Sequence, residues 1–198
     1  MANLPIVFVV FGPQGSGKST QVARLAERQG LKVFEAGKAL RERAEHDEKL
    51  RQEISVGILV SDEMMRTIVE AFVAENESEN GYVFDGYPRD LRQFVGFESL
   101  VEQYHWRVAG IFINLTDESA KKRLSTRFEM VNGQKVVRAD DTPEIVQKRL
   151  NTFKKETLPL KEQFSSHYQL LEIDGEPPVD DVTSLIDTAV DQFLDDRN

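Results

Sequence analysis

Short apolar runs alternate along the chain with longer stretches in which hydrophobic residues recur at every third or fourth position. The clearest run is Ile6–Phe11, six β-branched or aromatic residues that stop at a glycine, which is typical of a strand buried on both faces of a parallel sheet. Four later segments predict further strands, at Lys32–Glu35, 82–84, 108–115 and 168–173.

The segments between these strands favour helices. In 19–28, three apolar residues at helical spacing mark a buried face. Asp141 or Thr142 can cap the helix expected from Pro143 onward. The helices expected are 19–28, a broken set within 37–75, 117–127, 143–163 and 179–193. Short strands separated by helices predict an α/β fold, a five-stranded parallel sheet flanked by helices on both faces.

Two segments depart from this regular alternation. The stretch 37–65 is charged and mostly helical, with a break near 55–57, while 128–138 is polar. The pair Asn132-Gly133 is a tight-turn signal between valines and predicts a small hairpin. No internal repeat, low-complexity tract or Pro/Gly/Ser-rich linker divides the sequence, so we expect both segments to be excursions from one domain.

Composition narrows the classes of protein that this chain can represent. With 198 residues, 40% of them hydrophobic, it can bury one sizeable core. A net charge of −9 argues against coating a nucleic acid or an anionic membrane, and the lack of cysteine excludes disulfides and Cys-ligated zinc. The longest apolar run is far shorter than the about 20 residues that cross a bilayer, and it lacks the flanks of a signal peptide. We therefore expect a soluble cytoplasmic protein.

Residues 12–19 read GPQGSGKS and match the phosphate-binding loop G-x-x-x-x-G-K-[S/T] between a predicted strand and a predicted helix. The glycines allow consecutive N–H groups to converge on phosphate oxygens, and the helix N-terminus adds partial positive charge. Lys18 would neutralise the β- and γ-phosphates, and Ser19 would offer a hydroxyl to Mg²⁺. The motif predicts a nucleoside triphosphate site.

Asp85 ends the third predicted strand, so its carboxylate should emerge at the carboxyl edge of the sheet, where ligands bind in such folds. Beside the phosphate loop, this side chain is placed to hold the Mg²⁺ shell, through water.

Two motifs together resemble the adenylate kinases and their relatives, the nucleoside monophosphate kinases: residues 11–21 around the phosphate loop, and DGYPR at 85–89. That family carries G-x-P-G-x-G-K-G-T-Q and D-G-F-P-R. Further likenesses follow in the same order, at 37–41 (family T-G-D-L-L-R), 57–62 (G-x-L-V-x-D), 123–127 (R-L-x-x-R) and 138–150 (R-x-D-D, then R-L). The resemblance therefore covers nearly the whole chain.

The resemblance implies reversible, Mg²⁺-dependent phosphoryl transfer from ATP to AMP, giving two ADP. It also implies the P-loop NTPase fold, as one kinase domain over 1–198. The core would comprise 1–35, 66–127 and 139–198, with a helical insert that binds the monophosphate at 36–65 and a short lid at 128–138.

Site residues carry over by position. The resemblance implies that ATP is held by Gly15, Ser16, Gly17, Lys18, Ser19, Thr20 and Arg123. It implies that AMP is held by Ala36, Arg41, Ile58, Leu59, Val60, Gly86, Arg89, Gln93, Arg138 and Arg149. The catalytic charges would be Lys18, Arg89, Arg123, Arg127, Arg138 and Arg149. Such a set suits the chemistry, since phosphoryl transfer between two anions needs positive charge held in line rather than acid–base catalysis.

Several positions depart from the family pattern. Ala36 is typical of uridylate–cytidylate kinases, whereas Gln93 is typical of adenylate kinases, so the two markers of the acceptor base conflict. Pro177-Pro178 lies where short-lid relatives usually have Gly-Ser near the donor adenine. The lid is short and the chain has no cysteine, so the expected metal is Mg²⁺ alone, without zinc.

The leading interpretation is an adenylate kinase acting as a monomer on small-molecule nucleotides, with neither nucleic acid nor membrane as partner. The nearest alternative is a uridylate–cytidylate or broad-specificity monophosphate kinase, favoured by Ala36. A P-loop kinase of another small molecule fits less well, because it would not carry 85–89 together with Gln93. A non-catalytic nucleotide-binding regulator would not need Arg138 and Arg149.

Overall fold

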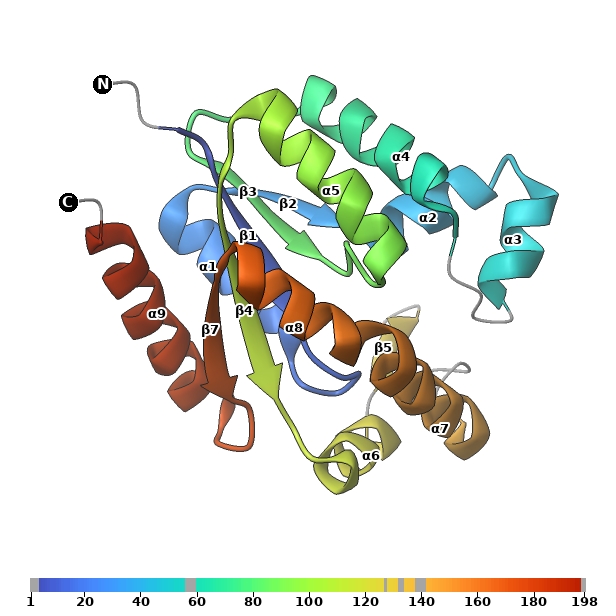
Figure 1. Cartoon of the computed structure of the whole chain (residues 1–198). Helices are drawn as coiled ribbons and strands as arrows, with labels where there is room; N and C mark the ends of the chain where they lie inside the picture. Colours follow the sequence, from blue (N-terminus) through green and yellow to red (C-terminus); the bar gives the residue numbers. More distant parts are fainter. Residues whose placement is uncertain (1–3, 56–59, 127, 132–133, 138–141, 197–198) are drawn as a thin grey trace.

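A parallel sheet of five strands forms the centre of the computed structural model, which describes residues 4–55, 60–126, 128–131, 134–137 and 142–196 (Figure 1). The strand order is β2-β3-β1-β4-β7, so the first strand of the chain lies in the middle. The bounds are β1 Ile6–Phe11, β2 Lys32–Glu35, β3 Gly81–Asp85, β4 Arg107–Asn114 and β7 Gln169–Asp174. All five predicted strands are confirmed, each to within one residue at either end.

Nine helices are described: α1 Lys18–Gln29, α2 Ala36–Ala44, α3 Glu48–Ser55, α4 Asp62–Glu75, α5 Leu91–Tyr104, α6 Asp117–Ser125, α7 Pro143–Thr152, α8 Leu158–His167 and α9 Val179–Asp195. Thr142 caps α7, because its hydroxyl accepts a hydrogen bond from the Ile145 N–H. One of the two caps predicted for this helix is therefore confirmed. None of the described helices is long and apolar enough to cross a membrane.

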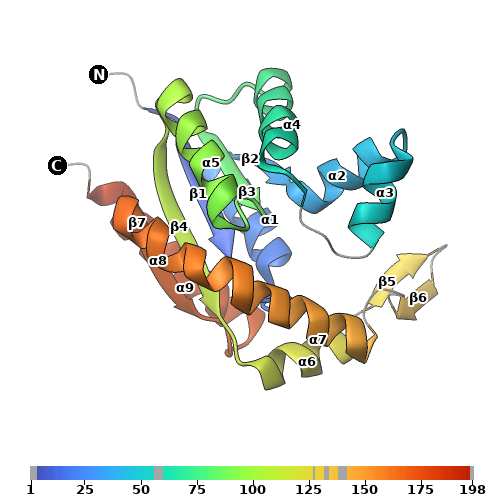
Figure 2. The ribbon, with the colours of Figure 1, turned by 45° about the vertical axis from the view of Figure 1, so that its right-hand side comes forward.

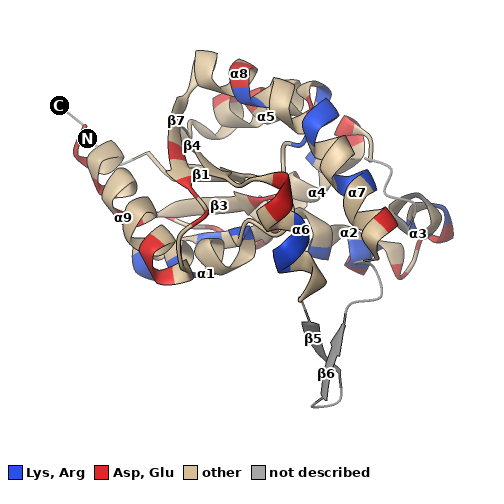
Figure 3. Cartoon of the chain, turned by 90° about the horizontal axis from the view of Figure 1, so that it is seen from below, with Lys and Arg blue, Asp and Glu red and all other residues tan. Residues whose placement is uncertain are grey.

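Two layers of helices cover the sheet because the side chains of β1 alternate between its faces. Val7, Val9 and Phe11 pack into a core under α4, α5 and α8. Phe8 and Val10 pack into a second core under α1 and α9. Figure 3 shows the sheet nearly edge-on between these layers, with α1 and α9 on one side and α5 and α8 on the other.

The helical prediction for 143–163 is confirmed, and the helical segment continues to His167. A π-helical turn, Phe153–Thr157, separates α7 from α8, although Figures 1 and 2 show the three segments following one another as one nearly continuous rod. Helix α5 was not among the expected elements, although Asp90 caps it by accepting a hydrogen bond from the Gln93 N–H. In the segment expected as a lid, β5 Phe128–Val131 pairs antiparallel with β6 Gln134–Val137, which confirms the predicted hairpin.

The register of the central strands sets where the chemistry lies. Val10 in β1 pairs with Asp85 in β3, and Phe11 pairs with Phe112 in β4. The carboxyl ends of these parallel strands therefore meet at one edge of the sheet. The phosphate-loop motif begins directly after β1, beside Asp85.

Candidate active site

The phosphate-loop motif forms the turn from β1 into α1. Gly12 has φ +148°, and a Cβ there would come within 2.7 Å of the Ile113 carbonyl oxygen in β4, so only glycine fits the close approach of these two chains. Gly15, Ser16 and Gly17 complete the turn, whereas Lys18, Ser19 and Thr20 are the first residues of α1. The Lys18 ammonium donates hydrogen bonds to the carbonyls of Gly12, at 2.8 Å, and Pro13, at 2.9 Å.

Ser19 and Asp85, the two residues predicted to hold Mg²⁺, lie in contact. The Ser19 hydroxyl donates a hydrogen bond of 2.9 Å to the Asp85 carboxylate. A hydroxyl and a carboxylate beside a phosphate loop are the hard oxygen donors that Mg²⁺ takes from protein when phosphates supply the remainder of its shell. The donor set therefore fits the expected metal. The part of the chain that the structure describes holds no group of three or more His, Cys, Asp or Glu side chains arranged for a metal ion.

A cleft of about 440 Å³ lies beside the phosphate loop and gathers most of the residues expected to bind the acceptor. From the predicted set it is lined by Lys18, Ala36, Arg41, Val60, Gly86, Arg89, Gln93 and Arg149. These residues come from four regions: the start of α1, helix α2 with the segment before α4, the turn after β3 with the start of α5, and α7. The fold thus brings these eight residues, which are far apart in the sequence, to one cleft.

Arg89 is held in this cleft by three hydrogen bonds. Its Nε donates to the Gly86 carbonyl at 2.8 Å, and its backbone N–H donates to Gln93 Oε1 at 2.9 Å. Its own carbonyl accepts from the Thr157 hydroxyl at 3.0 Å. Burial lowers the pKa of the Arg89 guanidinium, nearby Asp85 opposes that shift, and the positive charge of Arg149 adds to it. An arginine stays charged under such a shift, so the cleft presents a partly buried cation.

Gln93 is buried, with 2% of its surface exposed, and both polar atoms of its amide are engaged. Oε1 accepts from the Arg89 N–H, and Nε2 donates to the Val60 carbonyl at 3.3 Å. An amide oxygen has two lone pairs and an amide nitrogen has two hydrogens, so one acceptor and one donor position remain for a ligand. Ala36, fully buried at the start of α2, offers only apolar contact to the cleft.

Arg123 belongs to a second region, at the end of α6. Its guanidinium donates to the carbonyl of Glu176 at 3.0 Å, in the loop between β7 and α9. The Glu176 carboxylate accepts hydrogen bonds from the Ser119 hydroxyl and the Thr116 N–H, and these bonds hold the pKa of that carboxyl below its usual value. Arg123 is not among the residues lining the cleft.

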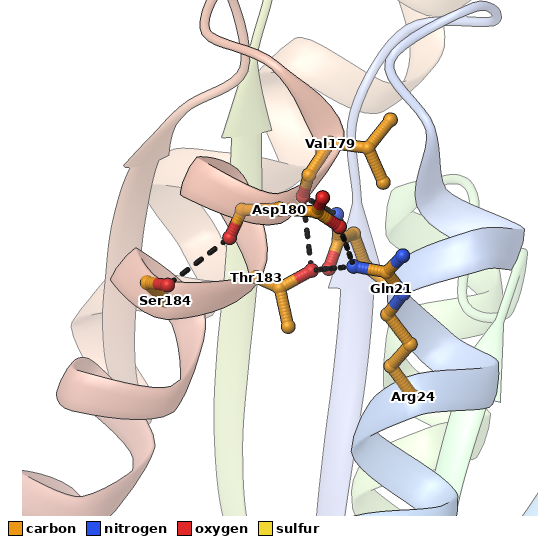
Figure 4. A network of polar contacts seen from close by, with 6 residues as sticks. All are labelled: Gln21, Arg24, Val179, Asp180, Thr183 and Ser184. Carbon is orange, nitrogen blue, oxygen red and sulfur yellow. Dashed lines mark hydrogen bonds and ion pairs between the residues drawn. The ribbon is translucent and has the colours of Figure 1, made fainter.

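The start of α9 is also tied to α1, directly after the phosphate loop (Figure 4). Gln21 Nε2 donates to the Val179 carbonyl at 3.0 Å, and the Thr183 hydroxyl donates to Gln21 Oε1 at 2.9 Å. Arg24 adds an ion pair with Asp180 at 2.8 Å. The loop 175–178 is therefore held at both ends, by Arg123 with α6 and by the helix that follows the phosphate loop.

Positive charge gathers around the cleft in a chain that is acidic overall. Figure 3 shows Lys and Arg positions of α2, α6 and α7 on the same side of the molecule. Four predicted site residues, Ile58, Leu59, Arg127 and Arg138, lie outside the described residues.

Sequence reasoning missed several residues of the cleft wall. Lys148, Thr152 and Phe153 contribute from α7 and the π-turn, and Gln14 contributes from the phosphate loop. Lys148 and Thr152 are four residues apart on one face of the helix that carries Arg149. Helical spacing could therefore have indicated both residues from the sequence. The apolar part of the wall, from Leu40, Ile54 and Met65, carries no motif of its own.

Comparison with known proteins places these observations in a family. A family model described as adenylate kinase matches residues 10–169. Among curated relatives, the adenylate kinase of Cyanothece sp. is 31% identical over 194 residues, covering 96% of this chain and 97% of that protein. The adenylate kinase of Sinorhizobium medicae is 31% identical over 185 residues, covering 90% and 96%. That of Methylorubrum extorquens is 32% identical over 192 residues, covering 93% and 96%.

Proposed function

Since this chain belongs to the adenylate kinase family, it is a nucleoside monophosphate kinase, and we propose that its cleft binds AMP for phosphoryl transfer from ATP. The observation that carries the assignment is the convergence of Lys18, Arg89 and Arg149 on one cleft beside the Ser19–Asp85 pair. A site of this kind provides cations on two sides of a migrating phosphoryl group. The alternative of a binding protein without turnover is not favoured.

The chemistry follows from charge and position. An oxygen of the AMP phosphate attacks the γ-phosphorus of ATP as the bond to the β-phosphate oxygen breaks, which yields two ADP. Lys18 lies at the phosphate loop and would neutralise the donor phosphates, while Arg41 and Arg89 would bind the acceptor phosphate. Arg149 would stabilise the charge on the phosphoryl group in transit, together with Arg127 and Arg138, which lie outside the described residues. Little acid–base work is needed, because the acceptor is already an anion.

Mg²⁺ bound with ATP would neutralise charge on the β- and γ-phosphate oxygens. Ser19 and Asp85 would hold this ion, Asp85 through water, which their hydrogen bond and oxygen donors support. Around the same phosphates, N–H groups of Gly15, Ser16, Gly17 and Thr20 would supply further donors.

The acceptor base would be read by Gln93. The free positions of its amide, one acceptor and one donor, match the N6 amino group and a ring nitrogen of adenine. Backbone groups of Ile58, Leu59 and Val60 would frame the base, with Ala36 leaving space beside it; Ile58 and Leu59 lie outside the described residues. On the donor side, Arg123 would contact ATP next to the loop that holds Glu176.

The domain would divide into a core, a monophosphate-binding insert at 36–65 and a short lid at 128–138. The breaks between α2, α3 and α4 and the separate hairpin β5–β6 support that division. The protein would act as a monomer on free nucleotides in the cytoplasm, and its net charge of −9 supports independence from nucleic acid and from anionic membranes.

A coupled assay with ATP as donor and AMP, CMP, UMP or GMP as acceptor tests the proposal. We expect ADP formation with AMP at the highest kcat/KM, dependent on Mg²⁺. A higher kcat/KM with CMP or UMP would move the protein to the uridylate–cytidylate kinases, and no turnover with any of the four would overturn the proposed reaction.

A further inference from the structure

Thr157 makes a hydrogen bond that its place in a helix does not require. It is the last residue of the π-turn, in which the Leu158 N–H bonds to the Phe153 carbonyl five residues back. Its hydroxyl does not turn back along the helix but donates to the Arg89 carbonyl, 68 residues away in the sequence, at 3.0 Å. Thr157 itself is half-buried and lines the cleft.

Two exposed helical threonines of this chain behave differently. Thr67 and Thr188 are exposed, and each donates its hydroxyl to the carbonyl four residues earlier in its own helix, at 2.9 and 2.8 Å. This back-bonding is the usual arrangement for a threonine inside a helix. Thr157 lies in a π-turn instead, and π-turns are frequent at functional sites.

The bond completes the immobilisation of the Arg89 backbone. Gln93 fixes the N–H of Arg89 and Thr157 fixes its carbonyl, while Gly86 holds Nε. Among the described residues, none accepts a hydrogen bond from the two Nη atoms, so the tip of the guanidinium remains available to a phosphate. A cation whose backbone is held on both sides needs less reorganisation when the ligand binds.

The same bond joins Arg89 to the element that carries Arg149. Arg149 lies in α7, and the π-turn that ends at Thr157 continues this helix as one rod (Figure 2). The Thr157 hydroxyl therefore ties the rod to the turn after β3. The two arginines are close enough for the charge of Arg149 to lower the pKa of the Arg89 guanidinium. Like charges at this separation repel one another and have to be held in place by the surrounding structure.

We propose that Thr157 is a positioning residue for the transfer reaction: its hydroxyl fixes Arg89, which would bind the acceptor phosphate, relative to Arg149, which would stabilise the phosphoryl group in transit. This inference rests on the proposed function, because it assigns the acceptor phosphate to Arg89. Thr157 acts through Arg89 and not on the base, so its influence is the same for every nucleoside monophosphate that the enzyme accepts. It does not contact the donor side, where Arg123 lies.

Two variants at position 157 and one control test the proposal. Thr157→Val keeps the shape of the side chain and removes the hydroxyl, whereas Thr157→Ser keeps the hydroxyl. Thr188→Val removes a threonine hydroxyl that bonds a helix carbonyl far from the cleft. We expect Thr157→Val to lower kcat/KM for AMP about tenfold, the effect of about one lost hydrogen bond, with KM for ATP within about twofold. Thr157→Ser and Thr188→Val should stay within about twofold of the unmodified protein in both constants.

The melting temperatures of all four proteins show whether each variant is folded. A folded Thr157→Val variant must still have the lower kcat/KM for AMP with an unchanged KM for ATP. Equal losses in Thr157→Val and Thr157→Ser, an equal rise in KM for ATP, or no loss at all would overturn the proposal.

The unmodified protein tests the proposed function in the same assay. If it prefers CMP or UMP, the base assignment fails, and the Thr157→Val loss must then appear at the same size with that acceptor. If it turns over none of them, calorimetric titration with AMP decides: weaker binding by Thr157→Val alone supports the positioning role. Unchanged binding, or no binding by any of the proteins, overturns it.

Discussion

The hydroxyl of Ser19 donates a hydrogen bond of 2.9 Å to the carboxylate of Asp85, across 66 residues of sequence. This contact joins the first turn of α1 to the end of β3, because β1 and β3 are neighbours in register and their carboxyl ends meet. It places a hydroxyl and a carboxylate where the phosphates of ATP would lie, so the sheet itself builds the proposed Mg²⁺ site.

Replacing Asp85 with Asn should therefore change how activity depends on Mg²⁺. The amide keeps the size of the side chain but loses the negative charge that would hold the hydrated ion. We expect kcat to fall on the order of 10²-fold at a fixed low Mg²⁺ concentration, with recovery at higher concentrations. Mg²⁺ titrations at saturating ATP and AMP measure this. Asp191→Asn, which breaks only an exposed ion pair with Arg28, serves as the control; identical titration curves for Asp85→Asn and the control would contradict the assignment.

Lys18→Ala should separate catalysis from folding. The Lys18 ammonium bonds the carbonyls of its own loop, Gly12 and Pro13, and is only half-buried. Its removal should change the melting temperature little, whereas the loss of a charge aimed at the migrating phosphoryl should lower kcat on the order of 10²-fold or more. Differential scanning calorimetry measures the melting temperature, and the coupled assay measures kcat. Lys32→Ala, an exposed lysine on β2, should leave both unchanged; near-normal turnover in Lys18→Ala would remove Lys18 from the mechanism.

Much of this fold could be predicted because its central strands are buried on both faces. Such strands are continuous apolar segments, and the one before the phosphate loop, Ile6–Phe11, was unambiguous. Helix α5 was missed although its signals were present: Phe94, Phe97 and Leu100 recur at helical spacing behind the cap at Asp90. The π-turn at Phe153–Thr157 left no comparable trace, since one inserted residue in a helix does not alter local composition.

The candidate site was predictable where a motif fixes chemistry, as for Lys18 and Arg89, and not where contacts depend on tertiary structure. Gln93 was expected to face a base, but the structure also uses both ends of its amide to hold Arg89 and Val60. Thr157 has no motif in the resemblance, and its contact with Arg89 depends on the packing of α8 against α5, which begins two residues after Arg89. Long-range hydrogen bonds of this kind follow from packing and not from sequence spacing.

Glu176 should make stability depend on pH in acid. Hydrogen bonds from the Ser119 hydroxyl and the Thr116 N–H, at the start of α6, hold its pKa below the usual value. A carboxyl with a lowered folded pKa stabilises the protein above the unfolded pKa, about 4.3, and this contribution is lost as pH falls through the folded value. The melting-temperature difference between the unmodified protein and Glu176→Gln should thus be largest near pH 7 and shrink below about pH 4.

Thermal melts of both proteins between pH 3 and 8 measure this difference. Glu162→Gln, an exposed residue of α8, provides a matched control whose melting difference should stay small throughout. A Glu176→Gln difference that grows towards low pH would reverse the sign and refute the argument.

Gln93 should dominate the choice of acceptor base over Ala36. Removing the amide in Gln93→Ala leaves the Arg89 N–H and the Val60 carbonyl without their partner and removes both contacts to adenine, at roughly 1–3 kcal/mol for each buried group left unpaired. We expect a large loss of kcat/KM for AMP together with a lower melting temperature. Ala36→Thr adds a hydroxyl and a methyl group at a buried position of the cleft wall. Only the hydroxyl can bond the base, so the ratio of kcat/KM for AMP to that for CMP should rise by about tenfold or less.

Ala39→Thr, the same substitution on the same helix away from the cleft, controls for the effect of threonine in α2 and should leave that ratio unchanged. The ratio is informative because protein folding and the phosphate contacts are common to both acceptors and cancel, which leaves only the base. If the unmodified enzyme already gives a higher kcat/KM with CMP or UMP, the apolar Ala36 and not Gln93 determines which acceptor base is preferred. The free positions on the Gln93 amide would then serve a pyrimidine instead of adenine.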